Sequence, residues 1–109
     1  MSFKVQNTKR FAKELKRLIR KYPSLKSEFI ELVFSLEKNP IQGTSIGNGF
    51  YKIRISIASK GKGKRGGARV ITYVKIIDEI VNLATIYDKS EKVDIEESEL
   101  NLILQSFLK

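Results

Sequence analysis

The sequence contains no cysteine, no histidine and no tryptophan, and only two of its 109 residues are proline. Without cysteine the chain has no disulfide framework and no thiolate metal site, which is compatible with a reducing compartment. Without histidine it lacks the commonest general base and the commonest metal ligand, and a histidine-dependent catalytic triad is excluded. The acidic residues show no spacing typical of a metal site. We therefore expect neither a metal nor a cofactor.

Long apolar runs are also missing. No stretch approaches the roughly 18 residues that a membrane span needs, and the first residues lack the apolar segment of a signal peptide. We therefore expect a cytoplasmic protein with no membrane partner. A chain of 109 residues can bury one hydrophobic core, so residues 1–109 are expected to form a single domain.

Positive charge is abundant and unevenly distributed. The net charge is +9, and residues 1–75 carry 18 basic and 4 acidic side chains, whereas residues 76–109 carry 3 and 8. Residues 59–69, SKGKGKRGGAR, hold five cationic residues and four glycines. This segment lacks the spacing of a nucleotide-binding P-loop. The charge indicates a polyanionic partner, either nucleic acid or an acidic protein.

The N-terminal part is predicted to be largely helical. Residues 3–6 alternate apolar and polar and favour a short strand. One helix is expected from Thr8 to Tyr22, where Pro23 ends it, and a second is expected after Ser24 as its N-cap, up to residues 39–40. Apolar residues at helical spacing predict that the two helices form a hairpin on a sheet: Phe11, Leu15, Leu18, Ile19 and Tyr22 in the first, and Leu25, Phe29, Leu32, Val33 and Leu36 in the second.

Residues 39–49 are predicted to be a loop, and three strands follow it. Residues 50–57 alternate, with an aliphatic row on one face and Lys52 and Arg54 on the other. Residues 68–76 and 80–87 form the next two strands. Asp94 and Glu97 make a capping-box pattern before a last helix. The pattern predicts an α+β fold in which two N-terminal helices pack on a twisted antiparallel sheet, with a C-terminal helix. The helices should cover one sheet face and leave the other partly open.

Lysine, arginine and tyrosine remain as candidate functional residues. These side chains are suited to binding a phosphodiester and cleaving it. In RNA cleavage a 2′-hydroxyl attacks the adjacent phosphorus, and negative charge builds on the phosphate oxygens. Arginine can bind these oxygens through two parallel hydrogen bonds. A lysine with a lowered pKa can act as a base, and tyrosine can bind the phosphate or stack on a base. The residues alone leave two interpretations open. They form either a catalytic site or a positively charged surface that binds RNA or DNA without catalysing a reaction.

Three segments occur in an order that resembles the RelE superfamily of toxins from bacterial toxin–antitoxin modules, with the HigB-like branch fitting best. They are GNGFYKIRIS, GKGKRGGARVITY and ATIYDKSEKVDI, and the resemblance covers roughly residues 40–100. It implies two N-terminal helices on a twisted antiparallel sheet. It also implies a ribosome-dependent mRNA endonuclease that a small antitoxin inhibits.

The resemblance also implies which residues form the site. The candidate catalytic set is Lys52, Arg54, Arg69, Tyr87 and Lys89. The candidate set for contact with RNA and the ribosome is Lys60, Lys62, Lys64, Arg65 and Tyr73.

The chain departs from the family pattern at several positions. Arg65 stands where a serine is common, and Thr72 stands where an aromatic residue is common. In some relatives a tyrosine of the C-terminal tail reaches the site. Here the aromatic residue after Tyr87 is Phe107, so Tyr87 or Tyr73 would have to take that role.

Two alternatives to an mRNA endonuclease remain. One is a toxin of the same fold that binds and poisons DNA gyrase without nuclease activity, and the other is a non-catalytic RNA-binding module. The expected partners are a cognate antitoxin with a helix-turn-helix DNA-binding fold, the ribosome and mRNA, with operator DNA reached only through the antitoxin. The acidic C-terminal part either balances charge on a solvated helix or contributes to the antitoxin contact, with Leu102 or Leu108 exposed for it.

Overall fold

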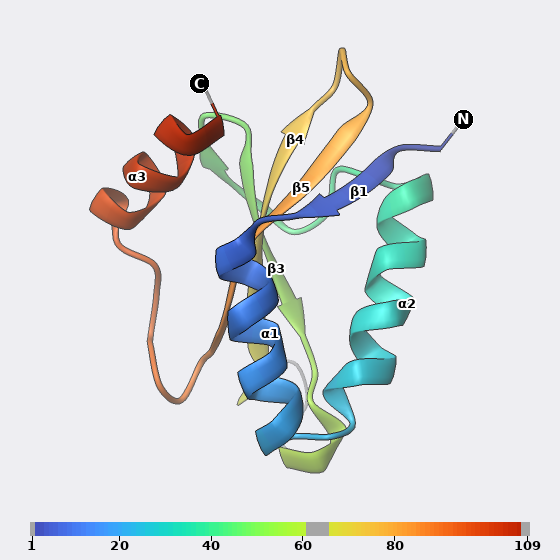
Figure 1. Cartoon of the computed structure of the whole chain (residues 1–109), viewed down its shortest axis with the longest axis vertical. Coiled ribbons are helices and arrows are strands. Elements are labelled where there is room, and N and C mark those ends of the chain that lie inside the picture. The colour runs from blue at the N-terminus through green and yellow to red at the C-terminus, as the bar shows by residue number, and fades with distance from the viewer. Residues whose placement is uncertain (1, 61–65, 108–109) are drawn as a thin grey trace.

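The computed structural model describes residues 2–60 and 66–107 and contains three helices and five strands (Figure 1). In chain order the elements are β1 (Lys4–Asn7), α1 (Lys9–Lys21), α2 (Leu25–Lys38), β2 (Thr44–Gly47), β3 (Phe50–Ile55), the short 3₁₀ turn η1 (Ala58–Lys60), β4 (Ala68–Lys75), β5 (Ile80–Asp88) and α3 (Glu97–Phe107). The α+β fold that the sequence predicts is confirmed. None of the helices in the described ranges is both long and apolar enough to cross a bilayer.

The five strands form one twisted sheet in the order β1-β5-β4-β3-β2. Strands β2 to β5 pair antiparallel, but β1 pairs parallel with β5, so the sheet is mixed and not purely antiparallel as expected. Residues 39–49 also contain a strand, β2, where the sequence predicted only a loop. Gly47, Asn48 and Gly49 all have positive φ, and this tight turn folds β2 back on β3 without the long alternation that normally reveals a strand.

The two N-terminal helices form where the apolar spacing predicts them, but the N-cap expected at Ser24 does not form, whereas Thr8 caps the first helix. The Thr8 hydroxyl accepts a hydrogen bond from the Phe11 amide at 2.9 Å and caps α1. Ser24 precedes α2, yet among the described residues its side chain makes no capping bond. Its hydroxyl instead accepts the Ser59 amide at 2.9 Å. Ser24 therefore joins the start of α2 to the turn η1.

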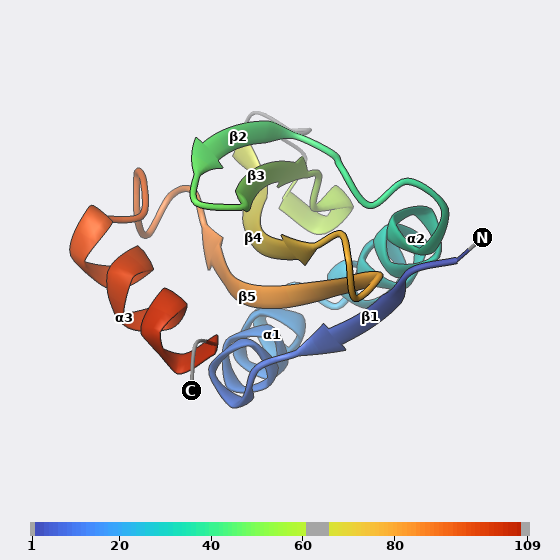
Figure 2. The same cartoon turned by 90° about the horizontal axis from the view of Figure 1, so that it is seen from above.

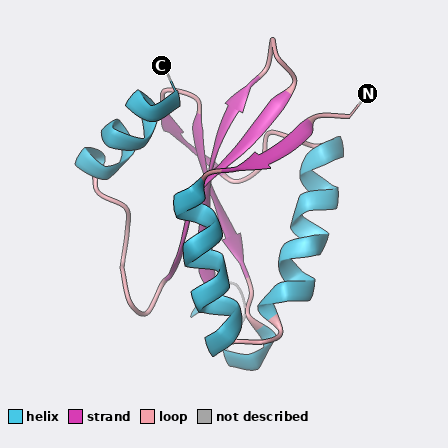
Figure 3. Ribbon diagram, viewed as in Figure 1, coloured by secondary structure: helices cyan, strands magenta, loops and turns pink. Residues whose placement is uncertain are grey.

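Helices cover both faces of the sheet, and this differs from the expected single covered face (Figures 2 and 3). One buried cluster joins α1 and α2 to the aliphatic row of β3 and to residues of β4 and β5 such as Val70, Val81 and Ile86. A second cluster joins α3 to the opposite face, where Ile103, Leu104 and Phe107 pack near Phe50 and Ile71. The open part of this second face is therefore limited to the surface that α3 leaves uncovered.

Thr72 lies on the sheet face that α1 and α2 cover. It is opposite Tyr51 of β3 and Leu83 of β5, and both of these pack in the first cluster. Its side chain is fully buried, and within the described part of the chain its hydroxyl has no hydrogen-bond partner. An aromatic residue at this position would face the core, so Thr72 does not deprive the opposite face of a stacking partner.

The substitution Thr72→Val is expected to stabilise the protein. It replaces a buried hydroxyl that lacks a partner with a methyl group of similar size, which removes a desolvation cost of about 1–3 kcal/mol. Denaturant unfolding should show a higher midpoint concentration of denaturant, while the slope of the unfolding free energy against denaturant concentration stays unchanged. A midpoint equal to or below that of the wild type would contradict this explanation.

Candidate active site

Three candidate residues form a row across neighbouring strands. Arg54 of β3 pairs directly with Arg69 of β4, and Arg69 pairs directly with Tyr87 of β5. Directly opposite residues place their side chains on the same face with Cβ atoms about 4.5–5.5 Å apart. Lys52 lies two residues from Arg54 and therefore shares its face. The structure thus brings together four of the five predicted catalytic residues.

The two arginines of this row differ in their exposure. Arg54 is exposed, whereas Arg69 is only 3% exposed and donates from Nη1 to the Ala68 carbonyl at 3.1 Å. Burial, followed by the positive charge of Arg54, lowers the pKa of Arg69, while Tyr87 and Asp94 act in the opposite direction. Two adjacent guanidinium groups in a partly desolvated place favour an anion with several oxygens, such as a phosphate.

The third member of the row, Tyr87, is buried and bonded to an aspartate. Its hydroxyl donates to Asp94 Oδ1 at 3.3 Å, and the Lys92 ammonium lies 5.5 Å from its ring centre. Burial and the negative charge of Asp94 raise the pKa of Tyr87 to about 12. Tyr87 therefore keeps its proton at neutral pH. Its ring is too enclosed to stack on a nucleobase.

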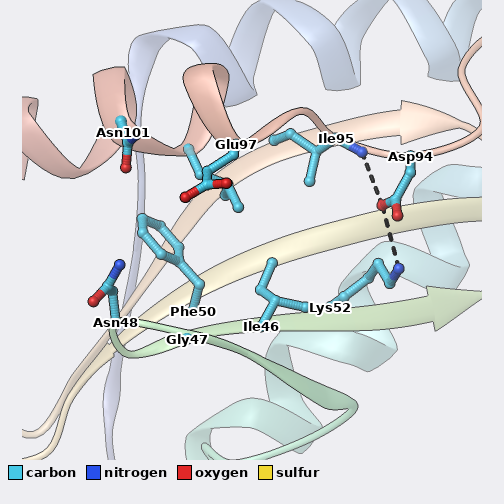
Figure 4. A pocket seen from close by; sticks show the side chains of 10 residues that line it. Ile46, Gly47, Asn48, Phe50, Lys52, Asp94, Ile95, Glu97 and Asn101 are labelled. Atoms are coloured by element: carbon cyan, nitrogen blue, oxygen red, sulfur yellow. Dashed lines mark hydrogen bonds and ion pairs between the residues drawn. The ribbon is translucent and has the colours of Figure 1, made fainter.

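Asp94 also binds Lys52, and the pair lies at one end of an open cavity of about 360 Å³ (Figure 4). Lys52 Nζ donates to Asp94 Oδ1 at 3.2 Å, and the Ile95 amide donates to the same oxygen at 2.9 Å. Other lining residues come from the β2–β3 turn and from α3, among them Asn48, Glu97 and Asn101. The sequence pattern predicts Asp94 as the cap of the last helix and not as a site residue. The helix begins three residues later, at Glu97.

We call residues 59–69 the basic loop. Lys60 lies at its start and is held inside the protein. Its Nζ donates to Asp88 Oδ1 at 2.6 Å, and both side chains are almost fully buried. The Tyr22 hydroxyl and the amide and hydroxyl of Ser90 also donate to Asp88. Burial acts to raise the pKa of Asp88, but the bonds from Lys60, Ser90 and Tyr22 prevail and lower it to about 2. We therefore leave Lys60 out of the proposed RNA-contacting set.

Both ends of the basic loop are fastened to the fold. At its start, Glu28 of α2 accepts the Ala58 amide at 3.2 Å and the Ser56 hydroxyl at 3.1 Å. At its end, the Lys89 amide donates to the Gly67 carbonyl at 3.1 Å. Only glycine fits at position 67, because a Cβ atom there would lie 2.1 Å from the Ile55 carbonyl oxygen. These bonds fix both entry points of the loop beside the row of Arg54, Arg69 and Tyr87.

The remaining predicted residues lie in different places. Lys62, Lys64 and Arg65 lie outside the described residues. Lys89 is half-buried just after β5. Tyr73 lies four residues from Arg69, or about 13 Å along β4, and its ring stacks on Phe107 with centres 4.9 Å apart. Because this stack belongs to the second core cluster, we do not include Tyr73 in the proposed site.

Acidic residues of the C-terminal part form ion pairs with the basic N-terminal part. These residues therefore balance charge as the first interpretation expected, but they do so against the basic part of the chain and not only on a solvated helix. The contact with the antitoxin stays a prediction; Leu102, named for it, is exposed, and Leu108 lies outside the described residues. The pairs are Asp88 with Lys60, Glu91 with Arg17 and Lys21, Asp94 with Lys52, and Glu99 with Arg10. No group of three or more acidic side chains that could hold a metal ion occurs in residues 2–60 and 66–107.

Comparison with known proteins gives two findings. A family model described as the RelE toxin of the RelE / RelB toxin–antitoxin system matches residues 3–106. A solved structure of toxin RelE from E. coli, a double arginine-to-alanine mutant in the free state, is similar with a TM-score of 0.64. It has 13% sequence identity, and the alignment covers 97% of this chain and 98% of that one. At this identity the structural likeness establishes the fold.

The buried Asp88–Lys60 pair contributes stability at neutral pH that is lost in acid. Since the folded pKa of Asp88 is about 2 and its ordinary value is near 3.9, its bonds contribute about 2–3 kcal/mol above pH 4, and this is lost as the pH falls towards 2. The substitution Asp88→Asn should therefore destabilise most at neutral pH, and the difference from the wild type should narrow towards pH 2. Denaturant unfolding at several pH values measures this difference.

Asp78→Asn, in the exposed turn between β4 and β5, provides the matched control and should show a small difference at every pH. A difference between Asp88→Asn and the wild type that stayed constant from pH 7 to pH 2 would contradict the assignment.

Proposed function

Because this chain belongs to the RelE toxin family of toxin–antitoxin systems, we propose that it is a ribosome-dependent mRNA endonuclease that inhibits translation. Family membership implies a cognate antitoxin as its partner. The substrate in this proposal is mRNA on the ribosome, and the reaction is cleavage of the RNA chain by its own 2′-hydroxyl group.

The observation that carries the proposal is the row of Arg54, Arg69 and Tyr87 with Lys52 beside it. When the 2′-oxygen attacks, a bond forms to phosphorus and the bond to the 5′-oxygen breaks. Negative charge increases on the non-bridging oxygens at the same time. The exposed guanidinium of Arg54, held in place by strand pairing, is a fixed hydrogen-bond donor for those oxygens, and such preorganised donors are usually the largest contribution to catalysis. Arg69 is almost fully buried beside it and adds positive charge under the site.

The basic loop supports the ribosome-dependent part of the proposal. Its entry points are fixed beside the row, and Lys62, Lys64 and Arg65 follow within the loop sequence. We assign these three cations to contact with ribosomal RNA phosphates. They would increase affinity for the ribosome without taking part in the reaction.

Removal of the exposed arginine tests the proposed chemistry. Arg54→Ala is expected to reduce mRNA cleavage on programmed ribosomes by about 10²–10³-fold, because one fixed donor for the phosphate oxygens is lost. Arg54→Lys should give an intermediate rate, since it keeps the charge but loses the planar fork. Arg20→Ala, which removes one exposed cation from α1, serves as the control.

Mapping of mRNA 5′ ends after expression of the toxin distinguishes the proposal from its alternatives. Cuts in phase with the translated codons are the expected result. DNA damage without mRNA cuts would favour the gyrase-poisoning alternative, and full cleavage by Arg54→Ala would exclude the proposed role of the row.

Replacement of Lys62, Lys64 and Arg65 together by glutamine tests the role of the loop. Each phosphate contact contributes about 0.7 to the slope of log affinity against log salt on single strands. Ribosome binding by the triple variant should therefore show a slope smaller by about 2, measured by co-sedimentation at several salt concentrations. Unchanged binding at every salt concentration would refute the assignment.

A further inference from the structure

Asp94 is a carboxylate in direct contact with two of the candidate catalytic residues. Its Oδ1 atom accepts hydrogen bonds from Lys52 Nζ at 3.2 Å, from Tyr87 Oη at 3.3 Å and from the Ile95 amide at 2.9 Å. The Asp94 side chain is 59% exposed and the Lys52 side chain 28% exposed. Both line the same cavity (Figure 4). A substrate can therefore reach both groups.

The site needs a group that is unprotonated at neutral pH to take the proton of the attacking 2′-hydroxyl. Tyr87 keeps its proton because its pKa is about 12, and the arginines remain protonated in proteins. Asp88 is fully buried and already accepts bonds from Lys60, Ser90 and Tyr22. Asp94 is both ionised and accessible.

The charged and titratable groups around Asp94 come from all the neighbouring elements. They are Lys52 on β3, Arg69 on β4, Tyr87 on β5 and Glu97 on α3. Partial burial acts to raise the pKa of Asp94, but the bonds from Ile95, Lys52 and Tyr87 prevail and lower it. The carboxylate is therefore charged at neutral pH.

We propose that Asp94 is the general base and Lys52 the general acid of the cleavage reaction, an assignment that rests on the endonuclease function proposed above. Asp94 takes the proton from the 2′-hydroxyl as the 2′-oxygen bonds to phosphorus. The phosphorus–5′-oxygen bond breaks, and Lys52 gives a proton to the leaving 5′-oxygen. The products are a 2′,3′-cyclic phosphate and a 5′-hydroxyl.

The contact between Lys52 and Asp94 also restores the starting state. After the reaction Asp94 is a carboxylic acid and Lys52 is a neutral amine. A proton passes from one to the other across the 3.2 Å hydrogen bond, so one proton has moved from the 2′-oxygen to the 5′-oxygen without any further reactant. Tyr87 is a positioning residue in this scheme, because its hydroxyl holds Asp94 in place from β5.

Variants of Asp94 test the general base. Asp94→Asn should bind programmed ribosomes as well as the wild type or more tightly, because it removes a negative charge, but it should cleave about 10²–10⁴-fold more slowly in a single turnover. Asp94→Glu retains a carboxylate and should recover part of the rate. Glu96→Gln removes a neighbouring exposed acidic charge and should cleave at the wild-type rate.

A modified mRNA tests the general acid separately. Its leaving 5′-oxygen at the cleavage site is replaced by sulfur, and a thiolate leaves without needing a proton because thiol pKa values lie near 8.5. With this mRNA the defect of Lys52→Ala should shrink at least about tenfold compared with natural mRNA. The defect of Asp94→Asn should stay the same, because its proton transfer is at the other oxygen.

Each result has a clear consequence. Cleavage by Asp94→Asn at the wild-type rate overturns the assignment, and so does faster cleavage, which would mean that Asp94 only competes with phosphate for Lys52. If the mRNA with the sulfur leaving group restores the cleavage rate of neither variant, Lys52 is not the general acid. If it restores the rates of both Lys52→Ala and Asp94→Asn, the two residues do not act separately as acid and base. If the wild type itself cuts no mRNA on the ribosome, the proposed function fails and this inference fails with it.

Discussion

The pairing register of β3, β4 and β5 determines the position of every group in the candidate site. A slip of one residue in a strand would exchange its two faces, and in β3 this would move Ile53 and Ile55 out of the core and turn Lys52 and Arg54 towards α1 and α2. The buried aliphatic row therefore makes such a slip very unfavourable. Hydrophobic burial on one face thus holds Arg54 and Arg69 together on the other, although their positive charges repel.

The positive charge of the first 75 residues is partly offset by acidic residues at the end of β5, in α3 and in the segment between them. The positive charge is concentrated in residues 1–75 and most of the negative charge lies after them, and the fold brings the two parts into contact through Asp88, Glu91, Asp94 and Glu99. The acidic C-terminal part therefore neutralises some of the basic charge of its own molecule. The charge that remains for a polyanionic partner is on the open part of the sheet face and in the basic loop.

Local patterns in the sequence predict part of this arrangement. The alternation in residues 50–57 gave the correct faces, and two successive hairpins were enough to bring Arg54, Arg69 and Tyr87 together. The partners of Lys52 and Lys60 could not be predicted in this way, because Asp94 and Asp88 are 42 and 28 positions away along the chain. A capping-box pattern at Asp94 even favoured a different role, since it depends on local spacing and takes no account of a distant lysine. Strand β2 was missed because positive-φ turn residues, and not alternation, define it.

The two lysine–aspartate pairs differ in burial and in strength, and each suits its place in the structure. The Lys60–Asp88 pair is buried and has additional hydrogen bonds, and breaking such a pair leaves an uncompensated charge in the interior. The Lys52–Asp94 pair is more exposed, with 28% of Lys52 and 59% of Asp94 accessible, and solvent-exposed pairs contribute only about 0–1 kcal/mol. A phosphate can therefore displace Lys52 from Asp94 at little cost, whereas Lys60 stays in place. The buried pair holds the start of the basic loop, and the weaker pair lies where the proposed reaction requires groups to change partners.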